Sequence, residues 1–141
     1  MKSKRLRSKD VFNLEKHIKV LKTPFEEVCR LLGEDETDPE GFLEVKDCVF
    51  LFDSERDYVF TGAVIMSDAY GFFGIQVGTN WMKAAAKLES QGFVQAEDLE
   101  RFTKPGTEVG VSVYLYPDDN PDASLSTVKD YSLCARYGQS L

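Results

Sequence analysis

The sequence contains a short helix-forming segment twice, and each copy is followed by residues that favour β-strands. In the first copy, Thr23 is a suitable N-cap, Pro24 suits the first helical position, and Gly33 is a typical helix terminator. The apolar side chains of this copy recur at helical spacing: Phe25, Val28, Leu31 and Leu32. The pattern predicts an amphipathic helix that begins at Thr23 and packs one face against another layer.

The second copy follows the same pattern. Thr79 is the expected N-cap, Gly92 is the expected end, and Phe93 can pack back against the helix. The apolar positions again form one stripe: Trp81, Ala84, Ala85 and Leu88. We interpret Trp81 as an anchor of this helix in the core.

Strand-forming residues follow each predicted helix. After the first, two β-rich runs at 42–53 and 58–66 flank a predicted turn at 54–57, and a bulge is expected at Gly62. After the second, strands are expected at 93–102, 110–116 and 127–137. The chain is therefore expected to fold as α+β, with a hairpin or three-stranded meander in its first half.

The shared order of elements predicts an internal repeat in a single domain that spans residues 1–141. We expect a basic flexible arm at 1–10, a first repeat at 11–70 and a second at 71–141. Each repeat would contribute a helix and an antiparallel hairpin. The helices would pack on one face of a curved antiparallel sheet.

Two segments resemble a known family. Ile75-Gln-Val-Gly-Thr79, followed by a helix with Leu88 and then Gly92-Phe93, resembles the repeats of beta-lactamase inhibitor protein-like domains. Thr23-Pro-Phe-Glu-Glu-Val-Cys-Arg-Leu-Leu-Gly33 resembles the helix of the related small outer-membrane lipoproteins of the barrel-assembly machinery. The resemblance implies a helical layer against a curved antiparallel sheet whose free face binds another protein. The chain differs from the family in having Lys22 at a usual glycine position, and in lacking a lipidation signal and the paired cysteines of the secreted inhibitor.

Charge and composition exclude several classes of protein. The chain has 141 residues and a net charge of −7, which argues against general nucleic-acid binding. Residues 1–22 carry a net charge of +6 and residues 23–141 carry −13, so the basic groups are concentrated at the start. No apolar stretch approaches the roughly 20 residues of a membrane-spanning helix. No apolar region follows the basic start, so we expect a cytoplasmic protein without membrane insertion.

The sequence shows no catalytic or metal-binding motif. His17 is the only histidine, and Cys29, Cys48 and Cys134 have no metal-ligand spacing. We expect three buried, reduced thiols without a disulfide, no cofactor, no metal and no enzymatic activity.

Strand alternation nominates a set of binding residues. Tyr114 and Tyr116 alternate with aliphatic residues, and so do Phe50 and Phe52. If the helices cover the aliphatic side, these four aromatic side chains share the open face and form a surface for a protein partner. The alternative is that they lie in the core or cover one another through cross-strand pairs.

We therefore expect a non-enzymatic, inhibitor-like module that binds an unknown protein partner through its sheet face. One alternative is a cytoplasmic immunity-type protein whose acidic body neutralises a basic toxin. Another is a small-molecule-binding or enzymatic domain with a pocket between helix and sheet.

Overall fold

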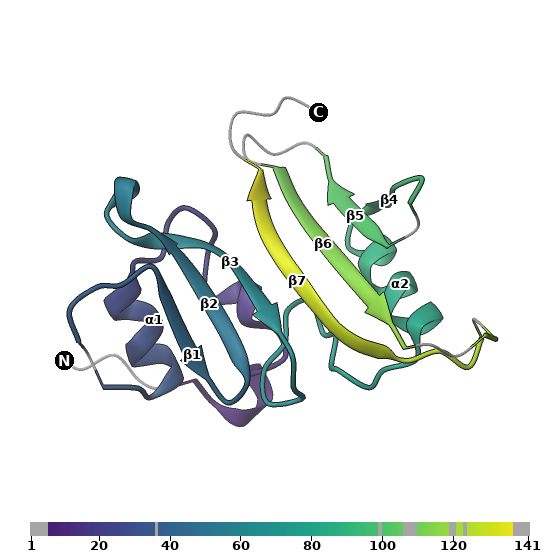
Figure 1. Ribbon diagram of the computed structural model, residues 1–141, viewed down its shortest axis with the longest axis horizontal. Coiled ribbons are helices and arrows are strands. Elements are labelled where there is room, and N and C mark those ends of the chain that lie inside the picture. Colours follow the sequence, from purple (N-terminus) through teal and green to yellow (C-terminus); the bar gives the residue numbers. More distant parts are fainter. Residues whose placement is uncertain are drawn as a thin grey trace.

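The computed structural model shows an α+β fold in which seven strands form one antiparallel sheet (Figure 1). The strands lie in the order β1-β2-β3-β7-β6-β5-β4, so β3 and β7 meet in the middle of the sheet. Both α-helices of the described part lie behind the sheet in Figure 1. The structure describes residues 6–35, 37–98, 100–105, 110–118, 121–122 and 124–136. The predicted α+β class is confirmed.

The first half contains one helix and a three-stranded meander. Its elements are α1 (Phe25–Leu32), β1 (Phe42–Val45), β2 (Cys48–Asp53) and β3 (Val59–Ile65). The β-rich run at 42–53 is divided by a two-residue turn in which Lys46 and Asp47 both have positive φ angles, of 50° and 64°. Such turns usually carry Asn-Gly, so the sequence contained no recognisable signal for this one. The predicted turn at 54–57 contains a single 3₁₀ turn, Ser54–Arg56.

The second half contains α2 and four strands. Its elements are α2 (Trp81–Ser90), β4 (Val94–Gln95), β5 (Arg101–Lys104), β6 (Gly110–Pro117) and β7 (Val128–Arg136). The expected single strand at 93–102 was wrong, because β4 folds back on β5 as an antiparallel pair. The Asp98 carboxylate accepts a hydrogen bond from the backbone N–H of Arg101 (3.0 Å), which stabilises the reversal.

Both helices begin one residue later than expected, with Pro24 and Asn80 at the N-cap positions in place of Thr23 and Thr79. Thr23 is buried, and its hydroxyl oxygen accepts a hydrogen bond from the backbone N–H of Lys19 (2.7 Å) instead of capping α1. At α2 the cap is Asn80, whose side chain accepts a hydrogen bond from Lys83 N–H (3.1 Å). The ends were predicted correctly, since Gly33 takes the left-handed conformation (φ 73°) that stops α1.

The two helix entries are joined to the sheet by equivalent backbone hydrogen bonds. In each half, the backbone N–H of the first helical residue donates to a carbonyl just before β3 or β7. The carbonyl of the residue two positions before the helix accepts from a backbone N–H of that same strand. The bonded pairs are Phe25–Tyr58 and Thr23–Phe60 at α1, and Trp81–Ser126 and Thr79–Val128 at α2. A register shift also occurs in each half, between Leu51 and Phe52 and between Tyr116 and Pro117. The threonines expected as caps therefore serve as bridging positions to the sheet.

The core lies between the sheet and the layer behind it. Besides the helices, that layer contains the N-terminal segment, drawn in purple in Figure 1. Leu14 and Ile18 of this segment are almost fully buried, and Leu21 N–H donates to the Phe60 carbonyl (2.7 Å). Phe60 is itself fully buried. The N-terminal segment is thus part of the domain from Leu6 onward, where Leu6 N–H donates to the Leu31 carbonyl (3.0 Å).

One buried hydroxyl joins β7 to the loop that precedes α2. The hydroxyl of Tyr131, a fully buried residue, accepts from Phe72 N–H and donates to the Ile75 carbonyl, both at 2.7 Å. Burial raises the pKa of Tyr131 above its ordinary value. Gly71 lies directly beneath this hydroxyl, and an added Cβ there would lie 2.9 Å from it. The loop can therefore approach β7 closely only with glycine at position 71.

Replacing Tyr131 by phenylalanine is expected to destabilise the fold by about 1–3 kcal/mol, because a buried N–H and a buried carbonyl both lose their partner. Urea denaturation measures the effect, and Tyr116→Phe on the exposed side of the sheet is the matched control. The wild-type chain should also lose stability as the pH rises above about 10, because a deprotonated Tyr131 is favoured only in the unfolded state. An unchanged midpoint in Tyr131→Phe would contradict this account.

Three further expectations concern the whole chain. Residues 1–5 of the expected arm at 1–10 lie outside the described residues, whereas Ser8–Asp10 form a 3₁₀ turn. No disulfide joins the three cysteines, all of which lie in the described part of the chain. Within that same part, no helix has both the length and the apolar character needed to cross a membrane.

Candidate protein-binding face

The face of the sheet opposite the helices is crossed by two rows of side chains in register. Directly paired residues in an antiparallel sheet point to the same side, so each row can be followed from strand to strand. The first row crosses six strands: Glu44, Val49, Val64, Ser132, Tyr114 and Arg101. The second crosses all seven: Phe42, Leu51, Gly62, Cys134, Ser112, Thr103 and Val94. We call this surface the open face.

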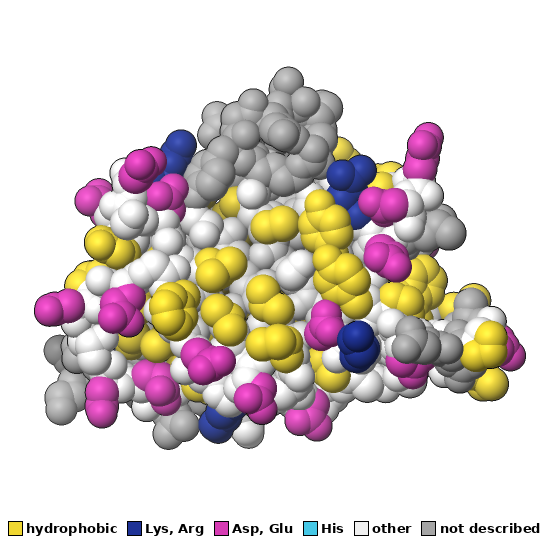
Figure 2. Space-filling view, viewed as in Figure 1, with side chains coloured by type: hydrophobic (Ala, Val, Ile, Leu, Met, Phe, Trp, Pro, Cys, Tyr) yellow, Lys and Arg dark blue, Asp and Glu magenta, His cyan; other side chains and the backbone are white. Residues whose placement is uncertain are grey.

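Large apolar side chains of the open face remain accessible to solvent. Phe42 is 57% exposed, Leu51 38% and Val94 56%, although all three belong to strands of the sheet. Figure 2 shows hydrophobic side chains gathered across the middle of this face, over strands of both halves. An apolar surface that continues over both halves of a sheet is the kind of feature that marks an interaction site.

Tyr114 and Tyr116 lie on the open face, as the sequence predicted. Their rings are stacked, with centroids 6.5 Å apart and an angle of 11° between the planes. Tyr116 is 37% exposed and Tyr114 is half-buried. In the register, Tyr116 is opposite Asp130 and Tyr114 is opposite Ser132 and Arg101. Two adjacent tyrosines held in parallel form a rigid aromatic surface with polar neighbours.

Phe50 and Phe52 do not share that face, so the expected placement of these two residues was wrong. Phe50 is 0% exposed and Phe52 6%, and both point toward the helical layer. The ring of Phe52 meets that of Phe25 in α1 edge-to-face, with centroids 4.9 Å apart. In β2 the aliphatic residues face outward and the aromatic residues face the core, the reverse of β6. The alternative of core burial therefore holds for Phe50 and Phe52.

The sequence analysis missed the aliphatic part of the open face. The aliphatic side of β2, formed by Val49 and Leu51, was expected to face the helices, and neither Phe42 nor Val64 was singled out. The alternation in β2 did contain the correct two sets of residues. What it did not contain was a signal for which set meets the helices.

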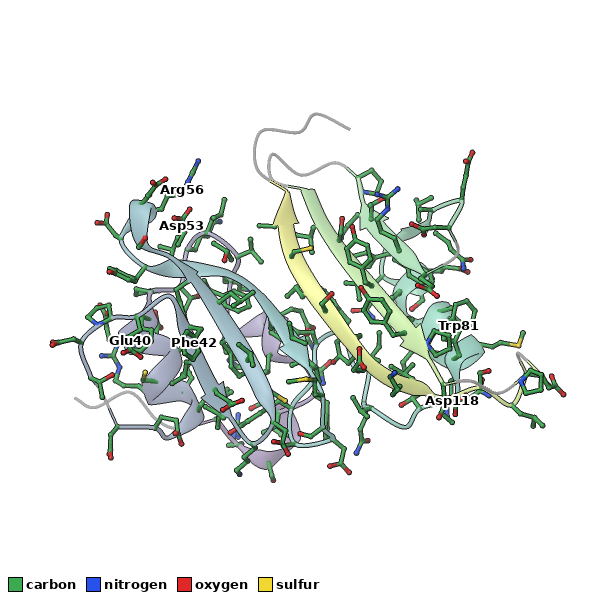
Figure 3. The ribbon with its side chains drawn as sticks, viewed as in Figure 1. Glu40, Phe42, Asp53, Arg56, Trp81 and Asp118 are labelled. Carbon is green, nitrogen blue, oxygen red and sulfur yellow. The ribbon has the colours of Figure 1, made fainter. Side chains whose placement is uncertain are left out.

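Charged side chains surround the apolar surface. Glu44 ends the first row on β1, and Arg101 lies at the other end, 3.9 Å from the Asp98 carboxylate. Figure 2 shows acidic side chains around much of the patch and far fewer basic ones. Figure 3 places Glu40 near Phe42 at one end, and the ion pair of Asp53 and Arg56 (3.6 Å) at the tip of the β2–β3 connection.

The remaining sequence candidates do not converge on a catalytic arrangement. His17 lies 3.8 Å from Asp10. Among the described residues, no three His, Cys, Asp or Glu side chains are grouped so as to hold a metal ion. Trp81 begins α2, labelled near Asp118 in Figure 3, and packs half-buried against the core. Its placement agrees with the expected anchoring role.

Chemically, the open face offers surface contact: aromatic rings, aliphatic side chains and hydroxyl groups inside a charged rim. Such a composition resembles the centre and border of protein–protein interfaces.

Compared with models of protein families, with curated proteins and with solved structures, the chain gives no match.

Proposed function

We propose that this chain is a non-enzymatic protein-binding module that uses the open face of its sheet. The observation that carries the proposal is the apolar surface formed by both halves on the side without helices. Tyr114 and Tyr116 are the proposed energetic centre, because stacked and partly exposed tyrosines can exclude water from a contact without losing much side-chain entropy.

The acidic rim supports a partner with basic groups around an apolar centre. Charge complementarity at a rim speeds association and selects among partners. Two copies of this chain would bring two acidic rims together, which disfavours face-to-face self-association. An immunity-type protein that neutralises a basic toxin would have this chemistry, and so would an inhibitor of a basic enzyme.

We also infer that the domain consists of two structural repeats, as the family resemblance implies. The equivalent hydrogen bonds at the helix entries and the matching register shifts support this inference. The sequence offset that superposes Phe60 on Val128 also superposes Val64 on Ser132. Val64 and Ser132 are directly paired where β3 meets β7, so the two halves meet at equivalent positions. An experimental structure should therefore superpose residues 23–66 on 79–137 with helix and hairpin in the same order. A different order of elements in the two halves would reject the repeat.

The binding proposal is tested by the double variant Tyr114→Ala, Tyr116→Ala. Loss of a tyrosine hot spot weakens a complex by ~2 kcal/mol or more, which is about 30-fold in affinity. The double variant should keep a melting temperature close to that of the wild type and fail to retain the partner in a pulldown from the native host. The protein retained by the wild type is then identified, purified and titrated against both forms.

A matched control removes two exposed residues from the other side of the molecule. Met82 and Lys83 lie on the exposed surface of α2, so Met82→Ala, Lys83→Ala should retain the partner. A large fall in the melting temperature of the tyrosine variant would assign the rings to structural support. Unchanged affinity with an unchanged melting temperature would reject the open face as the binding site.

A further inference from the structure

A second candidate site lies behind the sheet, away from the open face. It is a pocket of about 370 Å³ between the N-terminal segment and the second half of the chain. Most of its wall is apolar, and the side chains that form this part are Ile18, Val20, Phe73, Phe93, Val111 and Leu133. The volume falls at the lower end of the range of small-molecule pockets, ~300–1,000 Å³.

The pocket is lined by more basic than acidic side chains, although the chain as a whole is acidic. Lys19 and Lys104 line it, with Glu15 as the one acidic residue. One Glu15 carboxylate oxygen already accepts a hydrogen bond from Phe73 N–H (2.6 Å). In the described part of the chain, no carboxylate lies within ion-pair distance of either lysine ammonium. Two lysines therefore bring positive charge to an apolar pocket in a chain with a net charge of −7, and the Lys104 ammonium lies 5.8 Å from the centroid of the Phe93 ring.

The wall at Phe73 is held in an unusual backbone conformation. Phe73 has a φ of 59°, which is rare for a bulky side chain, and Gly74 follows with a φ of 75°. Three side chains hold this turn: Glu15 binds Phe73 N–H, Gln91 donates to the Phe73 carbonyl (3.0 Å), and Lys87 donates to the Gly74 carbonyl (2.8 Å). Strained residues held by several contacts occur preferentially at binding sites. Here the constraint fixes the ring of Phe73 as part of the apolar wall.

We propose that this pocket binds a small amphipathic anion, with an apolar body against the wall and one carboxylate between Lys19 and Lys104. The apolar wall supplies the contact area, and the two ammonium groups supply the preference for negative charge. The site is independent of the open face, because it lies on the opposite side of the sheet. It is also independent of the proposed protein partner.

The test uses octanoate as the probe, with 1-octanol and octylammonium as neutral and cationic analogues of the same chain length. Calorimetric titration of the full chain should show octanoate binding most tightly and octylammonium most weakly. Amide resonances of Ile18, Phe93 and Val111 should shift on addition of octanoate. The double variant Lys19→Met, Lys104→Met keeps the aliphatic stems and should raise the Kd of octanoate about tenfold or more.

Two controls separate this site from general charge effects and from the open face. Lys83→Met, Lys129→Met removes the same charge elsewhere and should leave the Kd of octanoate nearly unchanged, as should Tyr114→Ala, Tyr116→Ala. Melting curves check that every variant is folded. The proposal is overturned if octanoate does not bind, if 1-octanol or octylammonium binds equally well, or if the Lys19→Met, Lys104→Met variant binds octanoate like the wild type.

Discussion

Replacing Phe60 by alanine is expected to destabilise the protein by about 3–5 kcal/mol, the usual cost of removing a buried phenylalanine ring. Phe60 is fully buried and stacks on Phe72, with ring centroids 5.9 Å apart. It also lies 6.4 Å from the ring of Phe50 and 6.3 Å from that of Phe52. A cavity here would separate the aromatic rings of β2 from the ring of Phe72 in the loop before α2, because Phe60 of β3 lies between them. Urea denaturation should show a lower midpoint, and the melting temperature should fall by about 10 °C or more.

Phe42→Ala is the matched control, since it removes the same atoms from the open face. Phe42 is 57% exposed, so its loss should change stability by about 0.5 kcal/mol or less. A similar loss of stability in the two variants would contradict the division of the sheet into a core face and an open face. Phe42→Ala should weaken partner binding if the open face is the interface.

Replacing Gly62 by alanine is expected to disrupt the pairing of β3 with β7, the only connection within the sheet between its two halves in the described residues. An added Cβ would overlap the carbonyl oxygen of Leu133 and lie 3.3 Å from the Cα of Cys134. Both are backbone atoms, so the two strands must separate to make room. The expected cost is at the upper end of the range for overpacking, about 3 kcal/mol. Hydrogen exchange should show faster exchange at the amides of β3 and β7.

Gly41→Ala makes the same substitution in front of β1 and should have the opposite sign. Its added Cβ would come no closer than 3.9 Å to the Phe52 carbonyl oxygen. Alanine at such a position reduces the entropy of the unfolded chain and stabilises by up to about 1 kcal/mol. Equal effects of the two substitutions on stability would show that the pairing of β3 with β7 tolerates a side chain at position 62.

Local sequence was sufficient for the helices and for most strands, because their signals act over a few residues. Gly33 stops α1 through a left-handed conformation that glycine adopts without strain. The apolar stripe of α1 is the buried stripe in the structure, with Phe25, Val28 and Leu32 in the core. The helix starts were displaced because Thr23 and Thr79 use their backbone groups to bind Phe60 and Val128, residues that lie far along the chain.

The candidate site was predictable only in part. Alternation separated each strand into two sets of side chains, and it placed Tyr114 and Tyr116 together correctly. It could not say which set of β2 faces the helices, because Phe50 with Phe52 and Val49 with Leu51 are both apolar sets. Core packing decided this, since Phe52 meets Phe25 and Phe50 lies among the rings of Phe60 and Tyr70.

The sequence by itself determined the two amphipathic helices, the strand-forming runs between them and the concentration of positive charge at the start of the chain. These properties follow from residue type and spacing along a short stretch. The tertiary structure alone decided that β3 pairs with β7, that the aliphatic residues of β2 face outward, and that Lys19 and Lys104 meet at one apolar pocket. Each of these features joins residues far apart in the chain, so it depends on which packing of the whole domain buries the most apolar surface.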